Sequence, residues 1–210
     1  MMRFTRRAFI ASVLLAPGMA YAQQATQLPC PWNPARGSAD DLLSSPIVLQ
    51  NGQQQSARVW LQGRATVLTL FATWCPPCMI EKPLESAFNQ RLIAASSRTQ
   101  IKSMLAFDRT SLSDVSARMR EINAGSLEIA RASDRAELAA MHVFGFDRAR
   151  GSAISASRPT LDQIAARLPL TMVLDSSGRV MGDHEGTVKL CSGQSYWTDD
   201  AAFEQLRNLP

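Results

Sequence analysis

The sequence predicts an α/β domain in which helices flank a central mixed sheet and a β-hairpin extension precedes the core. Three observations predict this class. The strand expected at residues 67–71 is apolar on both faces apart from Thr69, and it runs into a helix through a Cys-Pro-Pro-Cys segment. Residues 100–107 predict a parallel neighbour for it. Finally, Pro169 directly precedes another apolar strand at 170–174.

The Cys-Pro-Pro-Cys segment, residues 75–78, places two thiols at the start of a helix. The partial positive charge of a helix N-terminus favours a thiolate, so Cys75 is the predicted nucleophile. Pro76 and Pro77 suit the first turn, where their missing N–H groups would have had no partner. Cys78, one turn further along, is placed to resolve a mixed disulfide formed at Cys75.

The residues around the cysteines resemble one family. Trp74, Cys75, Cys78, Glu81 and Pro83 match the Trp-Cys-x-x-Cys-x-x-Glu-x-Pro pattern of the TlpA/ResA-like (DsbE-like) branch of the thioredoxin superfamily. The resemblance implies a thioredoxin-like fold. The chain departs from the family six residues before the first cysteine, where Thr69 replaces the Asn or Asp of relatives, so a proton-carrying strand residue is not expected.

The resemblance also implies roles for residues that spacing alone does not assign. Pro169 is expected to be cis, to pack against the two cysteines and, with Leu168, to pair with the backbone of a protein partner. Trp74 and the two prolines of the Cys-Pro-Pro-Cys segment are expected to form an apolar docking surface. Pro159 is a rival position for the cis proline, although the residues after it favour a helix.

Glu81 follows Cys78 by three residues, so both side chains project from one side of the helix. A carboxyl group in a partly apolar cleft has a raised pKa and exchanges protons with a thiol. We therefore predict that Glu81 is a proton-exchanging catalytic residue, and the family resemblance suggests the same role. The alternative is an ordinary exposed glutamate.

Residues 1–22 predict a cleaved export signal. Arg3, Arg6 and Arg7 precede a short apolar run, and Ala-Tyr-Ala at 20–22 is a cleavage site. The segment at 5–10 resembles a twin-arginine signal, and an ordinary secretory signal is the alternative. Either signal predicts a soluble protein in the bacterial periplasm, an oxidising compartment.

The charge of the mature chain argues against nucleic-acid binding. The whole chain has 22 basic and 18 acidic residues. Loss of the three signal arginines leaves a net charge of +1, which gives no basic footprint. The remaining length fits one domain, and we expect residues 46–210 to form it as a monomer behind an extended arm at 23–45.

The expected elements follow the hydrophobic pattern and the turn residues. Strands are predicted at 46–49, 57–61, 67–71, 100–107, 126–130, 170–174 and 180–181. Helices are predicted from the first active-site cysteine to about 95 and at 112–122, 136–143 and 199–206. Residues 145–167 are expected to be an insertion, with one or two helical turns at 161–167.

Cys30 and Cys191 lie outside the family pattern. If Cys75 pairs with Cys78, the remaining pairing is Cys30–Cys191, and an oxidising compartment favours a bridge. We expect this disulfide to be structural, tying the polar arm to the domain and resisting mild reduction in the folded protein.

The sequence thus predicts a protein thiol–disulfide oxidoreductase without a cofactor. The resemblance implies a reductant of cytochrome c maturation or metal-site thiols, supplied with electrons by a membrane partner of the CcdA or DsbD type. A disulfide-forming oxidase is the alternative within this class. A metal-binding or delivery module is the alternative from another class, using the CxxC with Cys30, Cys191 or a histidine. No second CxxC is present, and neither His142 nor His184, the latter expected in a turn, has a partner spaced to share a metal.

Overall fold

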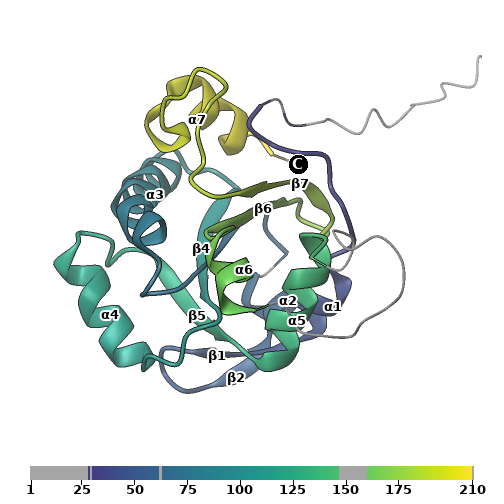
Figure 1. Cartoon of the computed structure of the whole chain (residues 1–210). Helices are drawn as coiled ribbons and strands as arrows, with labels where there is room; N and C mark the ends of the chain where they lie inside the picture. Colours follow the sequence, from purple (N-terminus) through teal and green to yellow (C-terminus); the bar gives the residue numbers. More distant parts are fainter. Residues whose placement is uncertain (1–27, 29, 62, 147–159, 210) are drawn as a thin grey trace, which may run out of the picture.

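A seven-stranded mixed sheet forms the centre of the protein (Figure 1). The computed structural model describes Leu28 and residues 30–61, 63–146 and 160–209; the expected export signal and most of the expected insertion lie outside them. The strand order is β2-β1-β5-β4-β3-β6-β7. The strands are β1 (Pro46–Leu49), β2 (Gln54–Ser56), β3 (Thr66–Phe71), β4 (Gln100–Leu105), β5 (Glu128–Ala132), β6 (Leu170–Leu174) and β7 (Val180–Glu185).

Helices cover both faces of this sheet. They are α1 (Asp40–Ser44), α2 (Ala57–Leu61), α3 (Pro76–Ala94), α4 (Leu112–Glu121), α5 (Asp134–Val143), α6 (Leu161–Ala165), the 3-10 turn η1 (Tyr196–Thr198) and α7 (Asp200–Arg207). In Figure 1, α3, α4 and α7 lie on one side and α1, α2 and α5 on the other. This arrangement confirms the predicted fold class and the hairpin extension β1–β2. Within the described residues, no helix is long and apolar enough to cross a membrane.

Strand β3 lies inside the sheet, as its apolar sequence predicts. All six of its residues are buried. It pairs in parallel with β4 and antiparallel with β6, so its neighbours hide both of its edges. The chain leaves the carboxyl end of β3 and enters α3 within five residues, which places the two cysteines at that edge of the sheet.

A row of polar side chains crosses the sheet on the face that α3 covers. The register places Ser103, Thr69, Thr171 and His184 side by side on β4, β3, β6 and β7. Cross-strand partners project from the same face. Ser103 Oγ lies 3.1 Å from Lys82 Nζ of α3, which identifies the face. The hydroxyls of Thr69 and Thr171 are buried without a hydrogen-bond partner.

The described part of the arm packs against the domain instead of lying extended over its surface. The Cys30–Pro31 peptide is cis, and Trp32 is buried. The backbone of Asn33 exchanges two hydrogen bonds with Asp183 at the edge of the sheet. Residues 40–44, expected to be extended, form α1 because two apolar residues, Leu42 and Leu43, are buried there against the domain.

Three further predictions differ from the structure. Residues 57–61 form helix α2 rather than a strand, because Ala57, Trp60 and Leu61 are buried at helical spacing. Strand β5 begins two residues later than expected. His184, expected in a turn, lies inside β7.

Candidate functional site

The two cysteines join the end of the β3 loop to the first turn of α3. Cys75 is the N-cap residue of α3, and its sulfur accepts a hydrogen bond from the Cys78 N–H at 3.2 Å. The two residues form a disulfide with a Cα–Cα distance of 5.3 Å. Cys75 is 3% exposed and Cys78 is fully buried, so Cys75 is the sulfur nearer to solvent. Its exposure is smaller than a nucleophile open to partners would suggest.

The loop that carries the cysteines is braced by the loop after β4. Asp108 accepts hydrogen bonds from the backbone N–H and the hydroxyl of Thr73, both at 2.6 Å. Burial acts to raise the pKa of Asp108, but hydrogen bonds from Thr73 and Thr110 outweigh it and lower the pKa. Trp74 Nε1 donates to the Phe107 carbonyl at 3.1 Å. Sequence reasoning missed Asp108, which lies 35 residues after Thr73 in the chain and belongs to no motif.

Several apolar side chains close to the cysteines in the sequence are exposed. Trp74 is 42% exposed and Ile80 is 68% exposed, and both prolines between the cysteines are exposed. Large apolar side chains exposed next to a reactive group favour contact with a partner. Trp74, Pro76 and Pro77 are thus exposed beside Cys75 in the sequence, and their role as a docking surface for a partner stays a prediction.

Pro169 lies at the same edge of the sheet as the cysteines. The register pairs Leu70 with Leu170, so Pro169 is next to the carboxyl end of β3. The Leu168–Pro169 peptide is cis, as expected. The Leu168 side chain is buried, and the Pro169 carbonyl accepts the Gly186 N–H at 2.8 Å. Backbone pairing of these two residues with a partner stays a prediction.

Glu81 is buried beneath the active-site turn, with an exposed fraction of 3%. Its Oε1 accepts hydrogen bonds from the Val188 N–H at 2.7 Å and from Trp197 Nε1 at 3.2 Å, while Oε2 is buried with no hydrogen-bond partner. Burial, with a smaller contribution from the charge of Glu85, raises the pKa of Glu81 to about 7. The structure thus excludes an ordinary exposed glutamate and leaves one carboxyl oxygen without a partner.

A buried ion pair lies on the same helix. Lys82 Nζ is 2.6 Å from Glu85 Oε2 and 4.5 Å from the centre of the Phe71 ring, and both charged side chains are fully buried. Sequence reasoning missed this pair. The signal was available, because Cys78, Lys82 and Glu85 follow one another at helical spacing and must share the buried face of α3.

Cys30 and Cys191 form the second disulfide, with a Cα–Cα distance of 6.0 Å. The predicted pairing is present. Both residues are exposed, so burial does not shield the bridge, and its resistance to mild reduction stays a prediction. The bridge fastens the arm to the loop between β7 and η1.

The metal hypothesis requires further ligands near the CxxC. The structure instead pairs Cys30 with Cys191. In the part of the chain that is described, no three His, Cys, Asp or Glu side chains gather in a group able to hold a metal ion.

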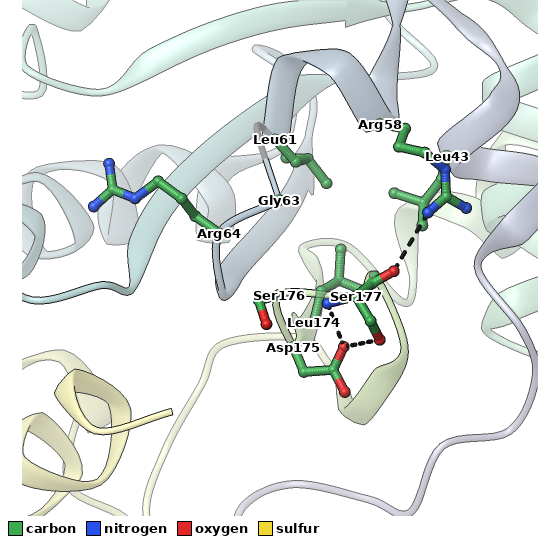
Figure 2. Close-up of a pocket in the computed structure, with 10 residues that line it drawn as sticks. Leu43, Arg58, Leu61, Gly63, Arg64, Leu174, Asp175, Ser176 and Ser177 are labelled. Carbon is green, nitrogen blue, oxygen red and sulfur yellow. Dashed lines mark hydrogen bonds between the residues drawn. The ribbon is translucent and has the colours of Figure 1, made fainter. Parts of the chain in front are cut away.

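A pocket of about 210 Å³ lies away from the cysteines. Its lining comes from the chain before β3 and from the turn after β6, at the amino end of β3. Figure 2 shows Arg58 reaching the Ser177 carbonyl and Arg64 pointing away from the pocket. The site described above does not use it.

Comparisons with known proteins identify similar structures. No protein-family model matches the chain, and no curated protein sequence matches it. A candidate electron transfer protein from Aquifex aeolicus VF5 has a TM-score of 0.50 at 12% identity, covering 79% of this chain and 90% of its own. A thiol:disulfide interchange protein of the thioredoxin family from Chlorobium tepidum TLS has a TM-score of 0.49 at 20% identity, covering 84% and 100%. A secreted Mycobacterium tuberculosis disulfide oxidoreductase, homologous to E. coli DsbE, has a TM-score of 0.42 at 16% identity, covering 68% and 84%.

Proposed function

We propose that this chain, whose fold is thioredoxin-like, is a thiol–disulfide oxidoreductase that exchanges electrons with protein disulfides through Cys75 and Cys78. One observation carries the proposal. The two cysteines form a disulfide at the N-terminus of α3, and the sulfur of the first one caps that helix. A helix N-terminus stabilises the thiolate that disulfide exchange requires.

The exchange proceeds in two substitutions. In the reduced protein the Cys75 thiolate attacks one sulfur of a partner disulfide, forming a mixed disulfide and releasing the other partner sulfur as a thiolate. The Cys78 thiolate then attacks the Cys75 sulfur and releases the second partner sulfur. The partner gains two electrons and becomes a dithiol, while the protein becomes the disulfide seen in this structure.

Glu81 supplies the proton exchange for the second step. Cys78 must lose its proton before it attacks, and it is fully buried, so bulk water does not reach it directly. Glu81 lies three residues further along the same face of α3. Burial is the main cause that raises its pKa to about 7. A carboxyl group of that pKa accepts and returns a proton near neutral pH.

We further propose a reductant that works in the periplasm after its export signal, residues 1–22, is removed. The family resemblance of the residues at 74–83 supports this direction. It also supports substrates among the thiols of cytochrome c maturation or metal sites, and a membrane electron donor of the CcdA or DsbD type. The exposed ring of Trp74, beside Cys75 in the sequence, suits a protein partner rather than a small molecule.

Two measurements test the proposal. The wild-type protein should catalyse reduction of insulin disulfides by dithiothreitol, and the Cys75→Ser variant should not. Equilibration with glutathione then gives the direction, because a reductant should have a potential below about −200 mV, whereas a value near −120 mV belongs to a strong oxidant. Absence of insulin reduction would overturn the oxidoreductase function, and the higher potential would overturn the direction alone.

A further inference from the structure

A single peptide group connects Glu81 to a histidine. The Val188 N–H donates to Glu81 Oε1 at 2.7 Å. The carbonyl of the same peptide, that of Thr187, lies 3.0 Å from Nε2 of His184. Hydrogen bonds that pass through one peptide group reinforce each other, because donation to the carbonyl polarises the N–H. A change in the hydrogen bond at the imidazole therefore changes the strength of the hydrogen bond to the Glu81 carboxylate.

The imidazole of His184 is held from several sides. It lies on β7 beside Thr171 of β6, and it makes a T-shaped contact with the Trp32 ring at a centroid distance of 6.3 Å. Its Nδ1 is 3.1 Å from the Pro31 carbonyl. Both ring nitrogens thus face carbonyl oxygens, which only accept hydrogen bonds. A neutral ring donates to one of them, and a protonated ring donates to both.

The described charged residues next to His184 and Glu81 form ion pairs with other residues. The neighbours of His184 on β7 project from the opposite face of the sheet. There they form these ion pairs: Arg36 with Asp183 and with Glu185, and Arg167 with Glu185. Tyr196 of η1 contacts Trp32 rather than the imidazole, among the ring contacts described. On the α3 side, the charged neighbours of Glu81 are Lys82 and Glu85, which bind each other.

We propose that His184 is a positioning residue for Glu81. It holds the Thr187–Val188 peptide with the N–H aimed at Oε1, and donation from Nε2 to the Thr187 carbonyl strengthens that hydrogen bond. The inference rests on the proposed oxidoreductase function, because that function gives Glu81 its proton-exchange role. His184 itself is outside the family pattern.

Two substitutions separate the two nitrogens of the ring. In His184→Asn the amide lies near the former Nδ1 and keeps the contact with Pro31, whereas in His184→Gln it lies near the former Nε2 and keeps the contact with Thr187. The ¹³C signal of the Glu81 carboxyl, followed against pH in the oxidised protein, should titrate near 7 in the wild type. We expect His184→Asn to raise that midpoint by about 0.5 to 1 pH unit, because the carboxylate loses a polarised donor. His184→Gln should restore most of the difference.

The control is His142→Asn, which changes the other histidine of the chain, on α5, and should leave the midpoint in place. In the reduced protein, the pH profile of Cys75 alkylation should shift in the same direction in His184→Asn. In a Glu81→Gln background the same substitution should have no effect on the profile.

Equal midpoints in His184→Asn and His184→Gln would overturn the proposal, as would an alkylation shift that persists without the Glu81 carboxylate. The ¹³C titration needs no disulfide exchange, so it stands or fails separately from the oxidoreductase function. If His184→Asn fails to fold, His184→Gln decides alone: a midpoint near the wild-type value supports the proposal, and one raised by about 0.5 to 1 pH unit would overturn it.

Discussion

The protein contains two disulfides whose surroundings are opposite. Cys75 and Cys78 lie 3 positions apart in the sequence and are buried at a helix N-terminus. Cys30 and Cys191 are separated by 161 residues and exposed on two loops. The inner bridge has a capped helix, a buried carboxyl group and an apolar surface around it. The outer bridge is exposed, and so are residues 192–194, which follow Cys191 in the chain.

This difference shows that exposure alone does not make a disulfide functional. Reactivity needs a stabilised thiolate, and the N-terminus of α3 provides that for Cys75. Among the described elements, neither outer cysteine lies at the start of a long helix: the element that follows Cys191 is the short turn η1. What the outer bridge provides is a constraint, because it closes almost the whole domain into one loop.

The largest expected effect separates the two bridges by activity. Cys78→Ser should trap protein partners as stable mixed disulfides at Cys75, because the resolving thiol is gone, and turnover should fall to the level without enzyme. The double variant Cys30→Ser/Cys191→Ser should keep turnover and trap nothing. Non-reducing gel electrophoresis with an insulin substrate reports both results. Trapping through Cys30 or Cys191 would instead show that the outer bridge is a second redox centre.

The next effect separates the bridges by stability. In the chain-entropy model a loop of 161 residues gives the outer bridge about 5 kcal/mol, whereas the inner ring gives about 2 kcal/mol. Urea unfolding of Cys30→Ser/Cys191→Ser should therefore show the greater loss of unfolding free energy. Cys75→Ser/Cys78→Ser is the matched control. A larger loss for the inner pair would mean that the outer bridge stores strain.

Much of the fold could be predicted from local sequence. The apolar residues of β3, the prolines at the start of α3 and the amphipathic pattern of α7 each predict their element from a short stretch of sequence. The predicted strand at residues 57–61 was wrong, because five residues that alternate in polarity can also bury one face of a helix. The pairing of β1 with β5 joins segments about 80 residues apart, and no local pattern predicts such a contact.

The candidate site divides in the same way. Cys78 and Glu81 share one face of α3 and Cys75 caps the same helix, so local spacing predicted that the three lie close together. The donors to Glu81, Val188 and Trp197, come from more than 100 residues away and are set by the path of the chain after β7. The helical spacing of Cys78, Lys82 and Glu85 indicated that Lys82 is buried, whereas its charge argued against burial, because an unpaired buried lysine is costly.

A third effect distinguishes the bridges by pH. The pKa of Glu81 is about 7 in the folded protein, against 4.5 ordinarily, and burial is the main cause. Between these values the folded state binds its proton more tightly than the unfolded state, so stability falls as pH rises from about 4.5 through 7. The loss approaches roughly 3 kcal/mol.

Glu81→Gln keeps the two accepted hydrogen bonds and has no proton to release, so its stability should lack this decline. Denaturant unfolding at pH 5, 6, 7 and 8 measures the difference. Loss of the outer bridge should lower stability equally at each pH. A wild-type profile as flat as that of Glu81→Gln would place the carboxylate in contact with water.

The smallest expected effect concerns the apolar surface that only the inner bridge has. Trp74→Ala removes an exposed ring whose indole nitrogen is held by the Phe107 carbonyl. We expect the KM for a protein disulfide to rise roughly five-fold, about 1 kcal/mol, since a peripheral tryptophan contributes at the lower end of interface residues. The rate with a small disulfide such as oxidised glutathione should change little, because that substrate does not span the surface. Ile93→Ala, at the other end of α3 and 66% exposed, is the matched control and should alter neither value. Equal losses on both substrates would instead mean that Trp74 positions the cysteine loop through Phe107.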